Sequence, residues 1–460
     1  MPYTPIDTTT GAGDTAQAGG NKINAMLSEL YARLDNVPAP KNNRIAIIGP
    51  SHAANHFNTG STTGLPSSFN ASAMGPVHWA NFLSGGRATL DSENCQGWNG
   101  DRSGADAGYP GALSRVDAVI ASGVGTVVLV AVTANDRNTM TAQASIDNLK
   151  IMIDKFVAAG LVVVILPDYP HGSTAGNTYI LSTEQQAYWD TVNSWTLKQQ
   201  TRGVYVIDTA AILRDHSAID GRGLSSMYVE GLHLNQQGAY AIGRAMAPLW
   251  RKIFPAFVGY PASNHSGAAG SVVAGLDTRN AYLNITSGAA AGTLPAAWSS
   301  PMGSGLTATF TKKTTTSFNG RSYAEDDGGP VSKDWLEFVV TGTATAAAEV
   351  IMLRQDYDVA MTVPHRAMAE IEIDSGHTGV NIINLNCWQS GNSVQARGFA
   401  SPGTNQSTLL PVGAHRGILR TPLFTMPGTA NRLQLQVLPI NGATVSITVR
   451  VRAIACGTDL

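Results

Sequence analysis

The 460-residue chain is predicted to fold as an α/β domain with a parallel sheet, followed by a domain of antiparallel β-strands. Two patterns give this prediction. Over residues 41–257, short runs rich in Val and Ile alternate with segments of helical periodicity. Over residues 272–460, apolar and polar residues alternate one by one. The stretch 258–271 between these regions is rich in Gly, Ala and Ser, and we predict that it is a linker.

The α/β prediction depends on four apolar runs that show little alternation, as expected of strands covered on both faces. They are residues 44–48, 126–132, 161–166 and 204–207. Segments of helical periodicity lie near residues 112–122, 142–159, 183–199 and 235–253. Because strands and helices alternate along the chain, a parallel sheet between two helical layers is expected.

The second domain shows the period-two pattern most clearly near the C-terminus. Val445, Ile447, Val449 and Val451 alternate with polar residues, and residues 433–437 and 369–373 follow the same pattern. This pattern predicts an antiparallel β-sandwich, jelly-roll-like, that binds carbohydrate or forms oligomers. Five aromatic residues could stack on sugars, although core positions are the better interpretation for most of them. They are Trp298, Trp335, Trp388, Tyr323 and Tyr357.

Residues 1–40 form a third region, which begins with a stretch rich in Thr, Gly and Ala. The following segment carries an apolar stripe at helical spacing, which predicts an amphipathic helix. The stripe consists of Ile23, Met26, Leu27, Leu30, Tyr31 and Leu34. Such a helix needs a partner, either its own domain or another chain.

Composition excludes several functions. Lys and Arg number 30 and Asp and Glu number 32, so the net charge of −2 gives no overall field to attract nucleic acid or an anionic membrane. No apolar run is long enough to span a bilayer, and no signal-peptide pattern opens the chain. Three cysteines are too few for a disulfide framework, so folding in a reducing cytosol is expected.

Four segments of the α/β region carry side chains suited to acyl transfer. Ser51 follows the first strand, and a Gly-rich loop ends at Gly104. Asn135 follows another strand, and Glu230 precedes His233 by three residues just before the last helix. A serine nucleophile needs a base, the base needs an orienting acceptor, and the oxyanion needs donors. Ser51, His233 and Glu230 can fill the first three roles. The backbone N–H groups of Ser51 and Gly104 and the amide of Asn135 can fill the fourth.

Each residue also has a simpler interpretation. Ser51 could cap the following helix, Asn135 and Asp136 could be turn residues, and His233 could be a surface histidine. The acid-x-x-His spacing occurs twice more, at Asp168/His171 and at Asp374/His377. The latter pair lies in the β region, whereas the former follows a strand and stays the alternative. His52 and His56, one helical turn apart, could form a metal pair, although no other metal motif accompanies them.

In this order the four segments resemble the motif blocks of the SGNH (GDSL-type) serine hydrolases. The resemblance covers about residues 43–257 and implies a flavodoxin-like α/β/α fold that uses no metal and no organic cofactor. It places the family's functional residues on Ser51, Gly104, Asn135 and His233. Three departures stand out: Gly-Pro50-Ser replaces Gly-Asp-Ser, Thr133 opens the Asn-Asp block in place of Gly, and Glu230 replaces the usual Asp. If Glu230 does not orient His233, the candidates are Asp168, Asp220 and a backbone carbonyl.

The first 31 residues resemble the leader of tail fibres and tailspikes of tailed bacteriophages, through Gly13-Asp14, Lys22-Ile-Asn24 and Glu29-Leu-Tyr31. This resemblance implies a virion tail protein that folds in the host cytosol and acts at a host cell surface. It also implies a homo-oligomer, expected to be a trimer, that contacts other tail proteins through residues 1–40. Together the two resemblances imply a serine esterase that removes O-acyl groups from bacterial surface polysaccharide. The alternatives are a non-catalytic receptor-binding tail protein with a degenerate hydrolase fold and a cellular carbohydrate esterase with an appended module.

Overall fold

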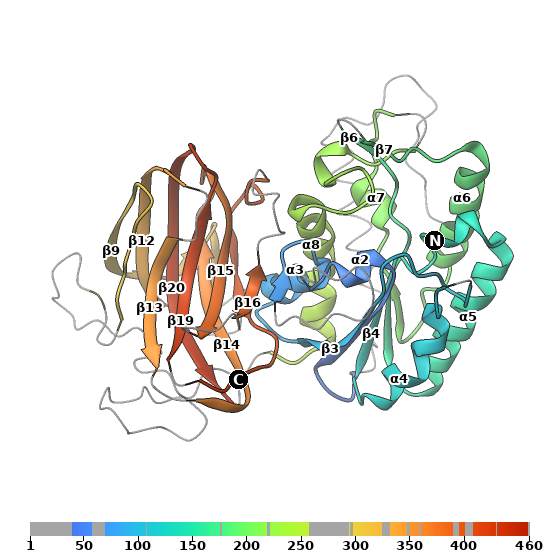
Figure 1. Ribbon diagram of the computed structural model, residues 1–460, viewed down its shortest axis with the longest axis horizontal. Coiled ribbons are helices and arrows are strands. Elements are labelled where there is room, and N and C mark those ends of the chain that lie inside the picture. The colour runs from blue at the N-terminus through green and yellow to red at the C-terminus, as the bar shows by residue number, and fades with distance from the viewer. Residues whose placement is uncertain are drawn as a thin grey trace.

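The structure is a computed structural model of the chain. It describes residues 39–57, 70–106, 108–174, 177–218, 221–256, 294, 298–323, 332–346, 350–357, 360–389, 395–400, 408–428 and 430–458. The predicted leader helix, the predicted linker and Asp220 lie outside these residues. Two parts lie side by side, an α/β part and a β part (Figure 1).

The α/β part is built on a five-stranded sheet with the order β3-β1-β4-β5-β8, in which every pair is parallel. Its strands are β1 (Arg44–Gly49), β3 (Thr89–Gly97), β4 (Thr126–Val130), β5 (Val162–Leu166) and β8 (Val204–Val206). Within this sheet the second strand in chain order, β3, lies outside the first, β1, which is the flavodoxin-like order. The predicted parallel sheet is therefore confirmed. Our sequence analysis missed β3 because it is an edge strand that carries polar residues, among them buried Asp91 and Asn94.

Helices cover both faces of this sheet. Side chains alternate along β1, so that Ile45 and Ile47 enter one apolar cluster and Ala46 and Ile48 enter the other. The first cluster includes α2 (Ser51–Ala54), α3 (Pro76–Leu83), α7 (Thr209–Leu213) and α8 (Gln236–Ile253). The second includes α4 (Val116–Ala121), α5 (Ala142–Ala158) and α6 (Thr183–Leu197). None of the helices that the structure describes is long and apolar enough to cross a membrane.

The β part consists of two sheets whose facing sides share one apolar core. The first has the order β17-β14-β20-β12-β9, and its strands are β9 (Leu306–Thr315), β12 (Lys333–Thr343), β14 (Met361–Ile373), β17 (His415–Arg420) and β20 (Thr444–Gly457), with β18 (Phe424–Met426) paired to β14. The second has the order β13-β19-β15-β16, with strands β13 (Val350–Tyr357), β15 (Val380–Gln389), β16 (Gln395–Ala400) and β19 (Asn431–Pro439). All these pairs are antiparallel, as predicted. A jelly-roll topology stays a prediction.

The aromatic residues of the β part are mostly buried. Trp298, Trp335 and Tyr323 belong to the interior. Trp388 is half-buried, and the guanidinium of Arg432 lies 4.7 Å from its ring centroid. Trp298, Trp335 and Tyr323 are therefore core residues, as the sequence analysis favoured for most of the five. The side chain of Tyr357 lies outside the described residues.

The two parts are joined by more than one chain connection. A short strand of the α/β region, β2 (Asn70–Ser72), pairs in parallel with β16 and so extends a sheet of the β part. Trp79 of α3 enters the core of the β part, with its ring centroid 4.4 Å from that of Phe399. Arg366 of β14 forms a buried ion pair with Asp91 of β3 at 2.9 Å. The β part is therefore packed as an integral neighbour of the α/β part.

Candidate active site

Ser51 stands at the carboxyl end of β1, where an open parallel sheet holds its ligands. It is the first residue of α2, and Pro50, not Ser51, occupies the N-cap position of this helix. Two close approaches position this short helix: a Cβ on Gly49 would lie 2.2 Å from the carbonyl oxygen of Val130, and one on Gly97 would lie 2.2 Å from the backbone nitrogen of Ala54. The Ser51 hydroxyl instead lies 2.7 Å from Nε2 of His233.

Glu230 and His233 belong to the loop that precedes α8. Oε1 of Glu230 accepts hydrogen bonds from Nδ1 of His233 and, at 3.2 Å, from its backbone N–H. Between the two residues Gly231 has a φ of +94°, and a Cβ there would lie 2.6 Å from the carbonyl oxygen of Gly172. Glycine thus permits the reversal that turns the carboxylate back onto the ring. The structure brings Ser51, His233 and Glu230 into one hydrogen-bonded chain.

Both ends of the histidine loop are anchored. Tyr228 donates a hydrogen bond to the carbonyl oxygen of Pro170. Asn235 caps α8 by accepting from the backbone N–H groups of Gln237 and Gly238. The adjacent Gln236 is fully buried, and its amide nitrogen donates to the carbonyl oxygens of Asn381, Thr408 and Leu409 at 2.7–2.8 Å. The β part therefore holds the helix end that follows His233.

The predicted oxyanion donors lie in loops that are joined to one another. The amide nitrogen of Asn135 donates to the carbonyl oxygen of Asp101 at 2.9 Å, which leaves its second hydrogen for a ligand. Asp136 is buried and accepts from the backbone N–H of Ser103 at 2.9 Å and from the hydroxyl of Ser145 at 2.7 Å. Asp136 thereby fixes the residue before Gly104. Burial raises the pKa of this carboxyl, and the hydrogen bonds from Ser103 oppose the shift.

A second group of polar side chains lies behind His233. The His52 ring centroid is 5.2 Å from that of His233 and 4.8 Å from that of Tyr169. Nη2 of Arg137 lies 3.5 Å from Nδ1 of His171. Burial lowers the pKa of His52 well below its usual value and, with the charge of Arg137, lowers that of His171 to about 3. Both rings are therefore neutral at physiological pH. Our sequence analysis did not single out Arg137, because no motif distinguished it from a surface arginine.

The other two acid-x-x-His pairs of the sequence contain Asp168 and Asp374, and neither acid is part of this hydrogen-bonded chain. Asp168 accepts a hydrogen bond from the Thr133 hydroxyl at 2.7 Å, so Thr133 directs its side chain into the interior. Burial raises the pKa of Asp168 to about 7. Asp374 forms an ion pair with Arg450 in the β part, at 2.7 Å. Among the residues that the structure describes, only His233 forms a hydrogen bond with the Ser51 hydroxyl.

His52 and His56 do not present a shared metal site. Nδ1 of His56 lies within 3.2 Å of the carbonyl oxygens of His52 and Ala53, and Nε2 accepts from the backbone N–H of Val77 at 3.3 Å. Both nitrogens of this ring are therefore engaged in the fold. No group of three metal-ligating side chains is found in the described part of the chain.

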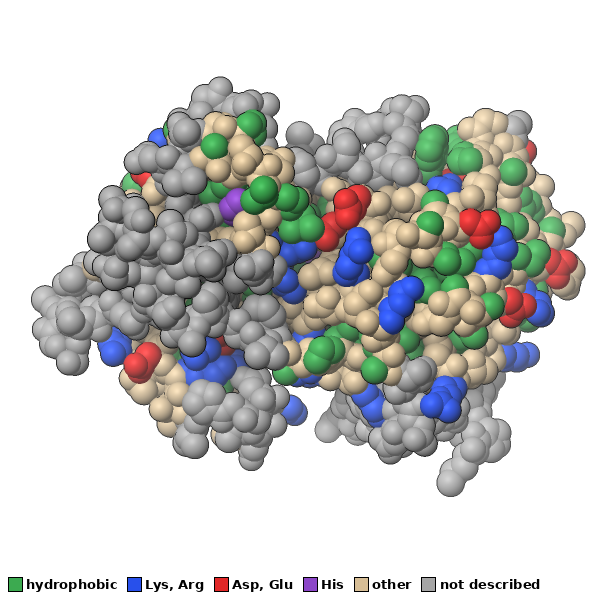
Figure 2. All heavy atoms as spheres, turned by 90° about the horizontal axis from the view of Figure 1, so that it is seen from below, with side chains coloured by type: hydrophobic (Ala, Val, Ile, Leu, Met, Phe, Trp, Pro, Cys, Tyr) green, Lys and Arg blue, Asp and Glu red, His purple; other side chains and the backbone are tan. Residues whose placement is uncertain are grey.

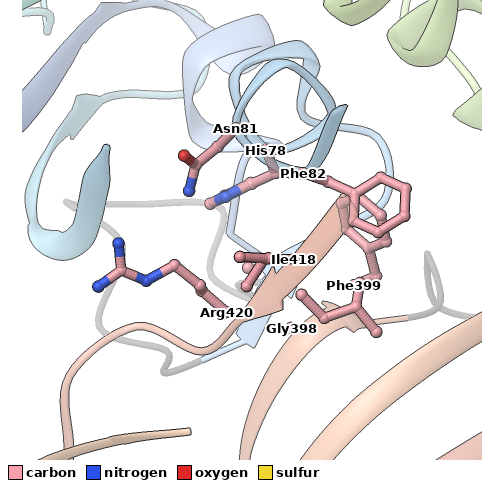
Figure 3. Close-up of a pocket in the computed structure, with 9 residues that line it drawn as sticks. His78, Asn81, Phe82, Gly398, Phe399, Ile418 and Arg420 are labelled. Atoms are coloured by element: carbon pink, nitrogen blue, oxygen red, sulfur yellow. The ribbon is translucent and has the colours of Figure 1, made fainter. Parts of the chain in front are cut away.

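A small pocket lies at the junction of the two parts, and neither Ser51 nor His233 lines it. Figure 3 shows His78, Asn81 and Phe82 of α3 facing Ile418 and Arg420 of β17 across it. Its polar groups already have partners within the protein: Asn81 accepts from the Ala88 N–H at 2.9 Å, and Arg420 donates to the Gly86 carbonyl oxygen at 2.7 Å. We interpret this pocket as a gap in the packing of the junction.

Charged side chains of both signs are scattered over one face of the molecule (Figure 2). On the face seen in Figure 2, Lys and Arg side chains alternate with Asp and Glu, and no broad area of one sign is visible among the coloured residues. This face gives no sign of a surface for nucleic acid.

Comparisons with known proteins give solved structures only, since neither protein-family models nor curated proteins match the sequence. A lipolytic protein of the G-D-S-L family from Desulfitobacterium hafniense is 15% identical, with a TM-score of 0.34, over 45% of this chain and 99% of that chain. A GDSL-like lipase from Bacteroides thetaiotaomicron is 12% identical, with a TM-score of 0.34, over 50% of this chain and 97% of that chain. A carbohydrate esterase of family 3 from Talaromyces cellulolyticus is 15% identical, with a TM-score of 0.29, over 45% of this chain and 95% of that chain.

Proposed function

We propose that this chain is a serine esterase that removes O-acyl groups, principally O-acetyl groups, from polysaccharide. The observation that carries this proposal is the hydrogen-bonded chain from the Ser51 hydroxyl through His233 to Glu230. It lies at the carboxyl edge of a parallel sheet, where substrates reach open α/β folds. The three side chains come from two loops 179 or more residues apart, so the fold itself assembles them.

The hydrogen bonds assign the order of proton transfer. Glu230 accepts the Nδ1 proton of His233, so Nε2 is free to take the proton of Ser51 as Oγ attacks the ester carbonyl. The imidazolium that forms is stabilised by the Glu230 carboxylate. It then protonates the ester oxygen of the sugar as the bond from that oxygen to the acyl carbon breaks, which releases the sugar hydroxyl and leaves an acyl-Ser51 ester. Water repeats the sequence with His233 as base, and the acid and free Ser51 result.

The oxyanion of each tetrahedral intermediate needs donors that do not move during the reaction. We assign this role to the N–H groups of Ser51 and Gly104 and to the second amide hydrogen of Asn135. The bond from Asn135 to Asp101 fixes the amide plane, and Asp136 fixes the Gly104 loop. No metal or organic cofactor takes part in this sequence.

The test is acetate release from a small aryl acetate and from O-acetylated bacterial polysaccharides, with wild type and Ser51→Ala side by side. We expect Ser51→Ala to lose hydrolysis while its unfolding transition matches that of wild type. Full activity in Ser51→Ala would exclude this mechanism. Polysaccharide binding without release of acid from any ester would favour the non-catalytic receptor-binding alternative.

We also propose that the chain acts in the tail of a phage virion at the host surface, as an oligomer. The support is the leader pattern within residues 1–31, and the β part would then bind carbohydrate or join the subunits. Sedimentation of the full chain and of a chain lacking residues 1–40 tests whether the leader carries assembly. A monomeric full chain would contradict the trimer.

A further inference from the structure

Arg137 has unusual surroundings for a largely buried cation. Its guanidinium donates to the carbonyl oxygen of Ala134 and to Nδ1 of His171, both of which are uncharged. Its Nε atom is buried without a hydrogen-bond partner. Among the described residues no carboxylate lies within ion-pair distance of this side chain, and burial lowers its pKa. A desolvated charge without a counterion is costly to the fold, so its retention calls for an explanation.

Arg115 and Arg366 also have a buried Nε atom without a hydrogen-bond partner, but each of them has a carboxylate within ion-pair distance. Arg115, on the neighbouring 3-10 helix Ala112–Arg115, lies 2.5 Å from the carboxylate of buried Asp101. Arg366 forms an ion pair with Asp91 at the junction of the two parts. Asp168 is the carboxylate whose charge acts most strongly on Arg137, but its Oδ2 is occupied by the Thr133 hydroxyl and burial raises its pKa to about 7. Asp136 also acts on Arg137 through its charge, and neither of these two carboxylates forms a hydrogen bond or an ion pair with the guanidinium.

The position of Arg137 connects it with the reaction. It follows Asn135 by two residues, within the short 3-10 helix Asp136–Asn138, and it is only partly buried. Its charge acts on His171 and on His52, whose ring adjoins that of His233. The guanidinium thus lies beside the His171 ring, on the turn that follows Asn135, and has N–H donors without a partner.

We propose that Arg137 forms a subsite for a carboxylate of the substrate, so that the esterase acts on O-acylated acidic sugars in preference to neutral ones. This inference deepens the proposed esterase function and rests on it. A carboxylate near the acylated carbon would supply the counterion that the fold omits, and guanidinium and carboxylate are matched in geometry. The neutral sugar analogue would leave Arg137 uncompensated and would bind more weakly.

The test uses O-acetylated polygalacturonate and the same polymer with its carboxylates converted to amides. Wild type is expected to show a kcat/KM for acetate release that is about tenfold to a hundredfold higher on the acidic polymer, the range for a charge-assisted hydrogen bond. In Arg137→Met this ratio is expected to fall towards one, mainly through KM, and Arg137→Lys is expected to retain part of it. Lys155→Met, which removes an exposed cation on α5, is the matched control and should keep the ratio of wild type.

Binding separates this subsite from the chemistry. Titration of the acidic polymer into Ser51→Ala is expected to give a Kd that rises about tenfold or more when Arg137→Met is added. Equal kcat/KM on the two polymers in wild type, with aryl acetate hydrolysis present, would overturn the subsite and leave the esterase intact. If Arg137→Met lowers kcat/KM by the same factor on both polymers, Arg137 has a structural role and the subsite proposal is wrong. Absence of Ser51-dependent aryl acetate hydrolysis in wild type would overturn the esterase itself.

Discussion

The junction between the two parts and the candidate catalytic edge of the parallel sheet differ in how buried charge is compensated. At the junction, Arg366 donates to both carboxylate oxygens of Asp91 at 2.9 and 3.1 Å and to the Thr421 carbonyl oxygen at 2.7 Å. At the catalytic edge, Arg137 meets only a carbonyl oxygen and a neutral histidine. The charge of Arg366 is compensated by a carboxylate within the fold, whereas that of Arg137 has no ion-pair partner, which is costly to the fold.

The outer face of the first β sheet repeats the pattern of the junction. Arg450 lies 2.8 Å from Glu337, 2.7 Å from Asp374 and 3.5 Å from Glu372. Its positive charge is surrounded by carboxylates and has no need of a ligand. If this comparison is correct, substitutions at the catalytic edge should lower activity without loss of stability, and substitutions at the junction should do the reverse.

The largest effect is expected for Glu230→Gln. The amide can still accept the backbone N–H of His233, but it cannot stabilise the imidazolium, so kcat should fall about 10²- to 10⁴-fold with little change in unfolding. Glu372→Gln in the β part is the control, and its kcat should equal that of wild type. Activity near wild type in Glu230→Gln would exclude Glu230 as the orienting group and return attention to Asp168.

A substitution at the junction should give the largest change in stability. Asp91→Ala leaves Arg366 buried without a counterion, and we expect the free energy of unfolding in urea to fall by about 3–5 kcal/mol. The double variant Asp91→Leu with Arg366→Met removes both charges and should recover most of the loss. Arg137→Met should change stability by less than Asp91→Ala, or even raise it. A loss in Arg137→Met as large as that in Asp91→Ala would contradict the contrast between the two regions.

Buried histidines in both regions predict acid sensitivity. Burial lowers the pKa of His56 and His171 to about 3 and of His78 and His415 to about 4. Below about pH 6.5 these histidines become protonated in the unfolded chain but stay neutral in the folded chain. The free energy of unfolding is therefore highest above that pH and falls as the pH drops towards the pKa values of the folded state. Each histidine contributes at most about 1.4 kcal/mol per pH unit.

Buried carboxyls act in the opposite direction. Burial raises the pKa of Asp168 and Glu372 to about 7, so the stability they contribute is present at low pH and is lost as the pH rises towards 7. Burial also raises the pKa of Asp136 and Asp208, and it lowers that of His52 and His377. These six histidines outnumber the four carboxyls, and the net expectation is a lower urea midpoint at pH 5.5 than at pH 7.5. His78→Gln should flatten this dependence. A midpoint that rises on acidification would show that the carboxyls dominate.

Much of the α/β part could be predicted because its signals are local. Strands β1, β4, β5 and β8 are apolar runs, and Ser51, Asn135 and the Glu230–His233 pair follow or precede regular elements at short, fixed spacings. Edge strand β3 escaped prediction because its buried polar residues face the junction, which exists only in the folded chain. Strand β2 escaped because three residues carry no periodicity and gain their partner from β16, more than 300 residues away in sequence.

The sequence alone determined four of the five strands of the parallel sheet and the helices between them, the antiparallel character of the β part, and Ser51, His233 and Glu230 as the candidate serine, histidine and acid. These features depend on periodicity and on residue types that occur at defined places in the chain. Only the tertiary structure decided that Glu230 reaches His233, that Gln236 ties α8 to the β part, and that Arg137 has no counterion. The physical reason is that hydrogen-bond partners and burial are set by side chains brought together from distant positions, which no local pattern records.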